Sequence, residues 1–584
     1  MKTLLTVAAL IALTMPACSD GPGDNDAGQP LPFLSDPLRA DAGCDWPQWG
    51  QNWAHTGQAC VAAQGFGTAL ATVTFDPFVP QEVEEAAGLF GRDDLFVHYA
   101  SPLVVGDDLY MAVKSGVYVS CSPPGNLGNP DPCGFDAWDQ QVWTVKHLAW
   151  ESGALVPKQS FGSSWKPPPA SVVAGWEPVF QPAVHDQVVW VPAGSGTVLR
   201  LDRQLVVLRA VNPFTDSNPN RYVTGPLVVD ADGTLLYNVI ELDALMPESG
   251  DARGYLVRVP PAGAPTTVLY QSIVNGAPVA SAQCPYSFRA GNIPGPYPAT
   301  VPVPTGPCGS QRPGFNAGPA IGPGGVVFVV SRAHYAPNDS SLVALNPDLT
   351  PRWTFRMREL MNDGCGVLAT SCRSGAPTGV DPSTGLRPSV QVSDQGSSVP
   401  VALPDGAVLY GGFTAYNGAR GHLVKVGPDG KLMGTYDFGW DVTPAVWVHG
   451  NTYSIITKDN HYFSASGAEG PYDMTQLSRD LKAEWKYTAT ETRSCSTEPD
   501  GGMTCVSDHP AGFEWCVNAP AIGPDGTVYA NSEDGRVYSI RQGGQLREQR
   551  FLLQSLGAAY TPIAVDSKGR VYSMNGGVMT VVGQ

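Results

Sequence analysis

Short runs of β-branched and aromatic residues alternate with tight polar turns along most of this chain. Between Asn518 and Ile540 (NAPAIGPDGTVYANSEDGRVYSI), three such runs are separated by Gly-Pro-Asp-Gly and Glu-Asp-Gly. Runs of this composition favour strands, and Gly526 and Gly535 can adopt the positive φ that a tight reversal needs. The segment therefore predicts a meander of short antiparallel strands.

The same pattern occurs eight times, each time as a proline before an apolar strand, a tight turn and a second strand. The copies begin at Pro102, Pro182, Pro226, Pro319, Pro400, Pro444, Pro520 and Pro562. Successive prolines are 42 to 44 residues apart in three intervals and 76 to 93 residues apart in the other four, which must carry insertions. A strand-only repeat of this length is typical of a four-stranded propeller blade. We expect an all-β fold, a single propeller with eight blades favoured over seven.

The two ends of the chain are predicted to share a blade. Residues Ala69 to Phe75 (ALATVTF) have the composition of a strand and precede the first proline copy, whereas the last copy has room for only three strands before the chain ends. The early strand would complete the last blade, which removes exposed sheet edges and ties the ends of the chain together.

The amino-acid sequence of the repeat resembles that of a known family. PAIGPDGTVYANSEDGRVYSI is similar to the repeat of the pyrroloquinoline-quinone-like (PQQ-like) β-propellers, and DWPQWGQNWAHTGQ is similar to the Trp-rich segment before their first blade. The resemblance covers roughly residues 45 to 584. It implies a propeller fold but leaves the activity open, because the family includes quinone-dependent dehydrogenases and also non-enzymatic lipoproteins that act as assembly scaffolds.

Composition agrees with one large β-domain. The 584 residues include 66 Gly and 54 Pro, with 43% hydrophobic and only 15% charged residues. This is enough apolar material for a large core and too little helix-forming charge for a bundle. The formal net charge is −18 and no basic stretch offsets it, which disfavours nucleic acid and anionic lipid surfaces as partners.

The N-terminus predicts export. Lys2 precedes the apolar run LLTVAALIALTMPA, which fits a secretory signal, and the run ends at Cys18 in a Met-Pro-Ala-Cys sequence that resembles a bacterial lipobox. We expect residues 1–17 to be a signal peptide, Cys18 to carry a lipid, residues 18–43 to form a disordered tether and residues 44–584 to form the propeller. Ordinary signal cleavage nearby is the alternative. The predicted location is the cell envelope, lipid-anchored at the outer membrane or cell surface.

Eleven cysteines follow Cys18, and export places them where disulfides form. Cys44 and Cys60 bracket the Trp-rich opening segment, and each long interval holds its own nearby cysteines. We therefore expect the pairs Cys44–Cys60, Cys121–Cys133, Cys284–Cys308 and Cys365–Cys372. The trio Cys495, Cys505 and Cys516 leaves one thiol whose partner is not predicted. Because the chain has no Cys-x-x-Cys pair, a zinc site is not expected.

The insertions are predicted to lie on one face of the ring. In a blade whose strands are named A to D from the axis outward, A–B and C–D turns emerge on one face and B–C and D–A connections on the other. The short Pro-Asp-Gly turns fit A–B and C–D positions, whereas the cysteine-bearing insertions follow B or D strands. These insertions contain side chains suited to binding a partner, although packing of their own loops is the alternative. They are Trp138, Trp165, Trp176, Tyr286, Arg289, Tyr297, Phe513 and Trp515.

No catalytic motif is visible. The quinone dehydrogenases that the repeat resembles carry an adjacent Cys-Cys disulfide and, in several branches, a Cys-x-x-Cys-His haem site, and neither sequence occurs here. Nucleophile-elbow, zinc-protease and phosphate-loop sequences are also missing. We therefore predict a monomeric, non-catalytic scaffold without cofactor or metal that binds an envelope protein or polysaccharide. The alternative is an exported quinoprotein oxidoreductase or carbohydrate-active enzyme at the channel mouth, since a carboxylate pair can be formed by distant residues.

Overall fold

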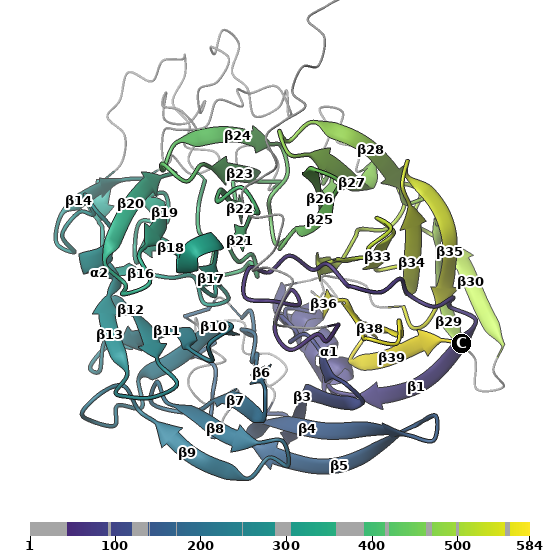
Figure 1. Ribbon diagram of the computed structural model, residues 1–584, viewed down its shortest axis with the longest axis horizontal. Helices are drawn as coiled ribbons and strands as arrows, with labels where there is room; N and C mark the ends of the chain where they lie inside the picture. Colours follow the sequence, from purple (N-terminus) through teal and green to yellow (C-terminus); the bar gives the residue numbers. More distant parts are fainter. Residues whose placement is uncertain are drawn as a thin grey trace, which may run out of the picture.

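In the computed structural model, eight four-stranded antiparallel sheets are arranged in a ring around a central axis (Figure 1). The structure describes residues 44–90, 95–119, 138, 140–170, 172–173, 175–247, 249–286, 305–357, 390–414, 420–462, 470–497, 502–554 and 561–584. Seven prolines of the sequence repeat lie just before an innermost strand and Pro226 lies within one, β10, so the prediction of eight blades is confirmed.

The strands of blades 1 to 4 follow one another along the chain. Blade 1 contains β2 (Leu103–Val105), β3 (Asp108–Gly116), β4 (Gln141–Glu151) and β5 (Ala154–Gly162). Blade 2 contains β6 (Ala183–His185), β7 (Val188–Pro192), β8 (Val198–Asp202) and β9 (Val207–Val211). Blade 3 contains β10 (Arg221–Val229), β11 (Leu235–Leu242), β12 (Ala252–Val259) and β13 (Thr266–Leu269). Blade 4 contains β17 (Ala320–Ile321), β18 (Val327–Ala333), β19 (Ser340–Leu345) and β20 (Pro351–Arg356), with β16 (Gln311–Arg312) also paired to β18.

Blades 5 to 8 complete the ring. Blade 5 contains β21 (Val401–Ala402), β22 (Val408–Gly412), β23 (His422–Val426) and β24 (Leu432–Tyr436). Blade 6 contains β25 (Ala445–His449), β26 (Thr452–Asn460), β27 (Tyr472–Ser478) and β28 (Ala483–Thr488). Blade 7 contains β32 (Ala521–Ile522), β33 (Val528–Asn531), β34 (Arg536–Arg541) and β35 (Gln545–Phe551). Blade 8 contains β37 (Ala564–Val565), β38 (Val571–Asn575), β39 (Val578–Gly583) and β1 (Thr68–Thr74).

The outermost strand of blade 8 comes from the other end of the chain, as predicted. Strand β1 pairs antiparallel with β39, with Thr68 opposite Gly583 and Thr74 opposite Val578. In Figure 1 the purple β1 lies beside the yellow β39. The ring is therefore closed by hydrogen bonds between the first and last strands, and β1 supplies the fourth strand of blade 8.

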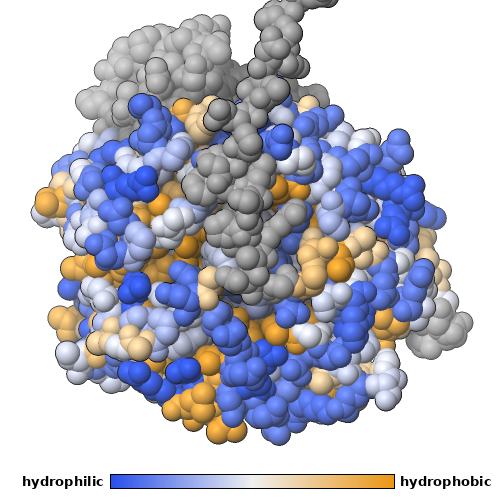
Figure 2. Space-filling model, in the orientation of Figure 1, coloured by the Kyte–Doolittle hydropathy of each residue, from blue (hydrophilic) through white to orange (hydrophobic). Residues whose placement is uncertain are grey.

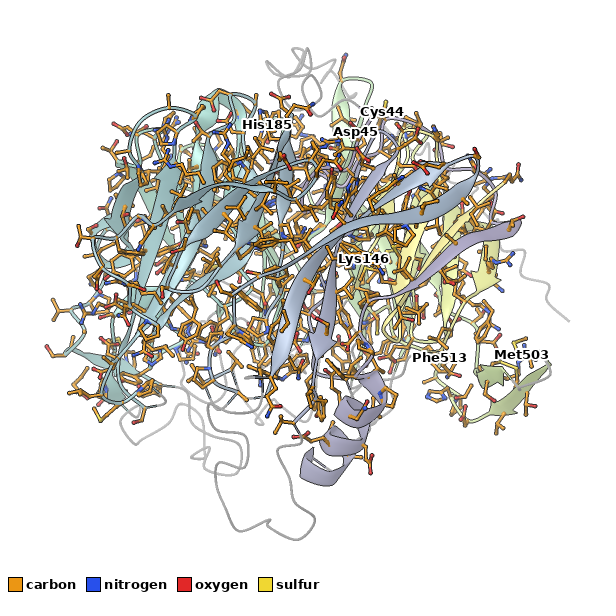
Figure 3. The ribbon with its side chains drawn as sticks, turned by 90° about the horizontal axis from the view of Figure 1, so that it is seen from below. Cys44, Asp45, Lys146, His185, Met503 and Phe513 are labelled. Atoms are coloured by element: carbon orange, nitrogen blue, oxygen red, sulfur yellow. A yellow bond between two sulfur atoms is a disulfide. The ribbon has the colours of Figure 1, made fainter. Side chains whose placement is uncertain are left out.

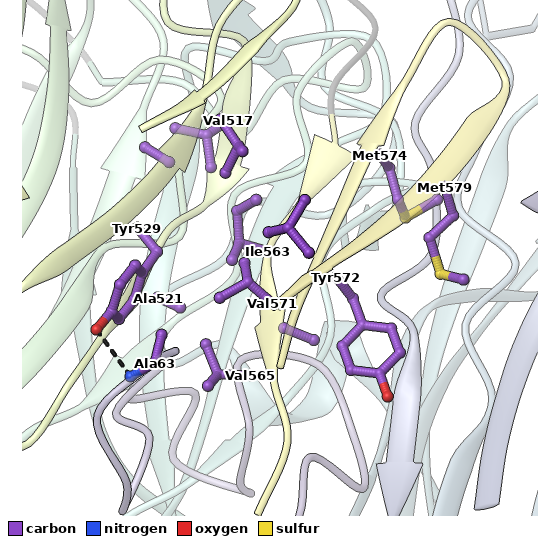
Figure 4. Packing of buried hydrophobic residues seen from close by; sticks show 14 of the residues in the cluster. Ala63, Val517, Ala521, Tyr529, Ile563, Val565, Val571, Tyr572, Met574 and Met579 are labelled. Carbon is purple, nitrogen blue, oxygen red and sulfur yellow. Dashed lines mark hydrogen bonds between the residues drawn. The ribbon is translucent and has the colours of Figure 1, made fainter. Parts of the chain in front are cut away.

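Aliphatic and aromatic side chains fill the space between neighbouring blades. Between blades 7 and 8, Ala521, Ile563 and Val571 are fully buried (Figure 4). The hydroxyl of Tyr529 accepts a hydrogen bond from the backbone N–H of Ala63 at 3.0 Å, so the segment before β1 is joined to the same core. Burying a side chain of the size of valine or leucine contributes about 1.5–3 kcal/mol, and this packing is repeated around the ring.

The Trp-rich segment crosses the ring and contacts every blade. We call residues 46–64 the N-terminal plug. Its contacts, in blade order, are Trp46 N to Val104 O (2.7 Å), Val184 N to Pro47 O (2.8 Å), Val229 N to Gln48 Oε1 (2.9 Å), Ile321 N to Trp53 O (2.8 Å), Ala402 N to Ala54 O (3.0 Å), Val446 N to Thr56 O (2.7 Å), Ile522 N to Gly57 O (2.9 Å) and Gln64 N to Gly569 O (2.8 Å). One short segment thereby joins seven innermost strands and the A–B turn of blade 8 at one end of the axis.

The two faces of the ring differ. The plain face carries the A–B turns, such as the one after His185, and the residues Cys44 and Asp45 that lead into the plug (Figure 3). Figure 2 looks onto this face, where hydrophilic residues cover most of the rim. The opposite face, which we call the insertion face, carries the helix α1 (Val79–Phe90), the hairpin β14 (Gln283–Pro285) with β15 (Thr305–Pro307), and the hairpin β29 (Arg493–Thr497) with β30 (Met503–Ser507).

The described insertions follow D strands and lie on one face, as predicted. Helix α1 separates β1 from blade 1, β14–β15 separates blades 3 and 4, and β29–β30 separates blades 6 and 7. The short helix α2 (Tyr270–Ile273) begins the second of these insertions, and β31 (Val517–Ala519), which pairs with β36 (Thr561–Pro562), ends the third. No helix in the described part of the chain has the length and hydropathy that a membrane crossing requires.

Three disulfides are present among the described residues. Cys44–Cys60 and Cys284–Cys308 are the predicted pairs, and Cys495–Cys505 resolves the trio, leaving Cys516 as a buried free thiol. Cys495 and Cys505 lie directly opposite each other in the β29–β30 hairpin. The predicted pairs Cys121–Cys133 and Cys365–Cys372 lie outside the described residues, as do Cys18 and the predicted signal peptide and tether.

Candidate functional site

Five polar side chains and one backbone N–H group, from six blades, meet where the chain enters the innermost strands. His98, Val179, Asn316, Ser397, Asp441 and Asn518 precede the innermost strands of blades 1, 2, 4, 5, 6 and 7 respectively. Asn316 Nδ2 donates to His98 Nδ1 at 3.3 Å and to the carbonyl of Gly396 at 3.2 Å, and its Oδ1 accepts from Val179 N at 2.8 Å. Blades 1 and 4 are not neighbours, so these contacts cross the axis. We call this group the axial cluster.

The other half of the axial cluster is equally connected. Asp441 Oδ1 accepts from Ser397 N at 2.5 Å and from the Ser397 hydroxyl, and Asn518 Nδ2 donates to Ser397 Oγ at 2.9 Å. His98 Nε2 lies 3.9 Å from Asp441 Oδ1. Burial lowers the pKa of His98, against the opposing effect of Asp441, so the imidazole is neutral at neutral pH. All of these side chains are buried, and their hydrogen bonds link blades across the axis at this level.

A second buried group lies beside the axis, around the ammonium of Lys114 on β3. Lys114 Nζ is 2.6 Å from Asp76 Oδ2, 2.6 Å from Glu82 Oε1 and 2.7 Å from Glu177 Oε2. Tyr99 donates to Asp76 at 2.7 Å and Trp143 Nε1 donates to Glu177 at 3.0 Å. We call these residues the Lys114 cage. Glu82 comes from α1 and Asp76 from the end of β1, so the cage joins an insertion to the closing blade.

The Lys114 cage holds three carboxylates against one ammonium, and this excess of negative charge changes its protonation. Burial raises the pKa of Glu82 to about 8; Lys114 opposes this shift, while Asp76 and Glu177 add to it. Burial also raises the pKa of Glu177. A carboxyl group of this kind can keep a proton at neutral pH, which reduces the repulsion among the three acids.

The cavity beside the Lys114 cage is too small for pyrroloquinoline quinone, the cofactor of the dehydrogenases that the repeat resembles. A cavity lined by His98, Tyr99, Lys114, Trp143 and Glu177 has a volume of about 20 Å³, which is room for about one water molecule. Sites for cofactor-sized ligands measure about 300–1,000 Å³. This cavity is therefore too small for a tricyclic quinone, and no reaction step is derived through one.

Asp459, His461 and Asp473 form a cluster with metal-ligating atoms within 4.8 Å of one another. Its oxygens already face cations, since Asp459 lies 2.7 Å from Arg420 Nη2 and 2.6 Å from Lys486 Nζ. Burial opposes ionisation of Asp459, but a hydrogen bond from His461 and the charges of Arg420 and Lys486 hold its pKa well below the usual range. The arrangement is an ion-pair network between blades 5 and 6, and nothing in it requires a metal.

The sequence-predicted binding residues are divided between core and surface. Trp165, Phe513 and Trp515 are buried and pack within the fold. Trp138, Trp176 and Tyr286 are partly exposed, and Arg289 and Tyr297 lie outside the described residues. The exposed candidates come from separate insertions, so no single aromatic cluster is formed by them in the described part of the chain.

The axial cluster and the Lys114 cage were not among the sequence predictions. One local signal was available for Lys114, because it alternates with Tyr110 and Ala112 along β3 and therefore points to the same side of the sheet. A lysine at a buried strand position needs partners that compensate its charge. Its partners come from three distant segments, which the strand pattern alone does not bring together.

Several solved structures are similar in shape to this chain. A europium-containing methanol dehydrogenase has a TM-score of 0.48 and 12% identity, covering 92% of this chain and 90% of its own. A quinohemoprotein alcohol dehydrogenase from Comamonas testosteroni has a TM-score of 0.44 and 12% identity, covering 95% and 79% respectively. BamB from Moraxella catarrhalis has a TM-score of 0.34 and 14% identity, covering 81% and 98%.

No protein-family model matches the sequence, and no curated protein matches it. These structural neighbours include two dehydrogenases and BamB. With identities of 12–14% and TM-scores below 0.5, these likenesses transfer no activity to this chain. The fold itself is established by the chain's own strands: an eight-bladed all-β propeller of four-stranded sheets.

Proposed function

We propose that this protein is a non-catalytic binding propeller of the cell envelope, anchored by a lipid on Cys18, that engages an envelope protein or polysaccharide through its insertion face. The observation that carries the proposal is the contrast between the axis and this face. Buried hydrogen bonds of the axial cluster cross the axis, whereas the insertion face is extended by a helix and two disulfide-linked hairpins.

Exposed apolar side chains support the choice of face. Among the described residues, the large hydrophobic side chains that are exposed lie either in insertion-face connections or on the outermost strands and the turns that lead into them. Those in insertion-face connections are Val117, Leu245, Met246, Val279, Met503, Val506 and Leu553. Apolar side chains gathered on one face are typical of a surface that binds a partner, and rigid hairpins lose little entropy when they bind.

The position of the N-terminal plug supports an orientation. Cys44, where the described chain begins, lies on the plain face (Figure 3), and the predicted tether from Cys18 would join the propeller there. A lipid at Cys18 would therefore hold the plain face nearer the membrane, leaving the insertion face free to meet a partner.

Reconstitution with a quinone separates this proposal from the enzymatic alternative. Purified protein is incubated with pyrroloquinoline quinone and Ca²⁺, desalted, and its absorbance spectrum recorded, with a quinoprotein dehydrogenase as positive control. Because the cavity beside Lys114 is about 20 Å³, we expect no retained quinone absorbance. Stoichiometric retention of the quinone, with dye-linked oxidation of an alcohol or sugar, would overturn the non-catalytic assignment.

A further inference from the structure

A cavity of about 490 Å³ lies between blades 1, 2 and 3, apart from the axial cluster. Its walls are the β7–β8 turn with Ser195 and Thr197, the segment after β5 with Ser164 and Lys166, and the loop before β10 with Ser217. B–C and D–A connections both emerge on the insertion face, so the cavity opens there. Its volume lies in the range of about 300–1,000 Å³ that is typical of small-molecule sites.

Hydroxyl groups dominate the polar lining of this cavity. Ser217 donates to Ser195 Oγ at 3.2 Å, and Ser164 Oγ accepts from the backbone N–H of Gly194 at 3.2 Å. Thr197 and Tyr222 add two more hydroxyls. A serine hydroxyl offers one donor and two acceptor positions, so one internal bond leaves positions with which it can bind a polar ligand.

The backbone that presents these hydroxyls is fixed. Ser195 and Gly196 have φ of 59° and 72°, in the left-handed region, and the hydroxyl of Tyr237 donates to the carbonyl of Gly196 at 3.2 Å. Beneath the pocket, Trp165 Nε1 donates to the carbonyl of Val223 at 2.8 Å. A preformed wall loses little conformational entropy when a ligand binds.

Both cations of the lining are engaged by protein acceptors. Lys166 Nζ donates to the carbonyl of Trp138 at 3.1 Å and to the carbonyl of Gln141. Arg221 Nη1 lies 2.6 Å from Asp216 Oδ1, and Arg221 Nε lies 2.5 Å from Glu241 Oε2, while its guanidinium covers the ring of Phe214 at 4.1 Å. The charge of this guanidinium is already compensated by two carboxylates, so it does not need an anionic ligand. The formal net charge of −18 also repels polyanions. Paired guanidinium and carboxylate groups can still exchange hydrogen bonds with the hydroxyls of a neutral ligand.

We infer that this cavity binds a neutral saccharide unit of an envelope polysaccharide. A ring bearing several hydroxyls matches a lining of serine and threonine hydroxyls, and Ala193, Leu199 and Pro219 supply limited apolar surface for its C–H groups. The walls lack a deep apolar subsite in the described residues, which a peptide side chain would need. The inference rests on the proposed function and names the partner class for the insertion face.

Saturation-transfer difference NMR with defined probes tests the inference. Wild-type protein is titrated with neutral hexasaccharides (maltohexaose, cellohexaose, chitohexaose and mannohexaose), with oligogalacturonate as the acidic probe and with an uncharged hexapeptide. Ser217→Trp places an indole in the cavity, and Thr215→Trp adds the same group at an exposed position of the same loop that does not line the cavity. We expect at least one neutral saccharide to bind, with about a tenfold or greater loss of affinity in Ser217→Trp and no loss in Thr215→Trp.

Three results would overturn the inference: no neutral probe binds the wild type, only the acidic or peptide probe binds, or Ser217→Trp binds as the wild type does. Each leaves the non-catalytic assignment standing, because quinone retention tests that assignment separately. Conversely, new reducing ends released from a bound saccharide would contradict the proposed function while keeping the saccharide site.

Discussion

Glu82 is the residue whose environment has the clearest consequence for stability. Its ordinary pKa of 4.5 is raised to about 8 in the folded protein. Between about pH 4.5 and pH 8, the carboxyl group of Glu82 is protonated in the folded protein and ionised in the unfolded chain. The free energy of unfolding therefore falls as the pH rises through this window. Below the window both states are protonated, and above it the full cost of the buried carboxylate is present.

Replacing Glu82 with Gln should remove this cost. We expect Glu82→Gln to raise the free energy of unfolding by about 2–4 kcal/mol at pH 8 and to change it much less at pH 5, because Lys114 keeps Asp76 and Glu177 as partners. Denaturant unfolding at both pH values measures the difference. Glu84→Gln, on the exposed side of the same helix, should show no such pH dependence. A variant at Glu82 that is less stable than wild type at pH 8 would contradict the account of the cage.

At the scale of the element, the disulfides divide into two kinds. Cys44–Cys60 encloses residues 46–59 of the N-terminal plug, which are hydrogen-bonded to seven blades of the folded ring. Cys495–Cys505 joins the two strands of a hairpin that extends from the insertion face (Figure 3). Without its disulfide, the hairpin can open while the ring stays folded, so the folded and unfolded states gain similar freedom.

Removing the two disulfides should therefore have unequal effects. Replacing Cys44 and Cys60 with Ser should lower the free energy of unfolding by about 2–4 kcal/mol, whereas replacing Cys495 and Cys505 with Ser should lower it by less than about 1 kcal/mol. Proteolysis should show the converse, with faster cleavage in β29–β30 of the second variant before global unfolding. Equal losses in global stability would mean that the hairpin supports the ring.

The elements that could be predicted from sequence are those set by neighbouring residues. Proline, apolar strand and Pro-Asp-Gly turn lie within about a dozen residues of one another, so every innermost strand was found from its own sequence. The pairing within the trio could not be found, because the register that places Cys495 opposite Cys505 belongs to the hairpin. The axial cluster was also inaccessible, since His98 and Asn316 are 218 positions apart and only ring closure brings them together.

For the whole molecule, the tether and the plug give the two faces different roles. The plain face receives the N-terminal chain, and the insertion face carries part of the exposed apolar residues and the proposed saccharide cavity. The central claim is that this second face is covered by a partner when the protein is in the envelope. Methionines of nearly equal exposure allow a test, because Met246 and Met503 lie on the insertion face at 56% and 55% exposure and Met433 on the outer strand β24 at 53%.

The most direct measurement is methionine oxidation, quantified by mass spectrometry, in envelope-bound wild type and in purified Cys18→Ser protein. The variant should leave the membrane fraction and oxidise at all three methionines at similar rates. In the envelope, we expect Met246 and Met503 to be protected severalfold relative to Met433, since a bound partner excludes the oxidant from the insertion face alone. Equal oxidation of the three methionines in the envelope, or protection confined to Met433, would contradict the account.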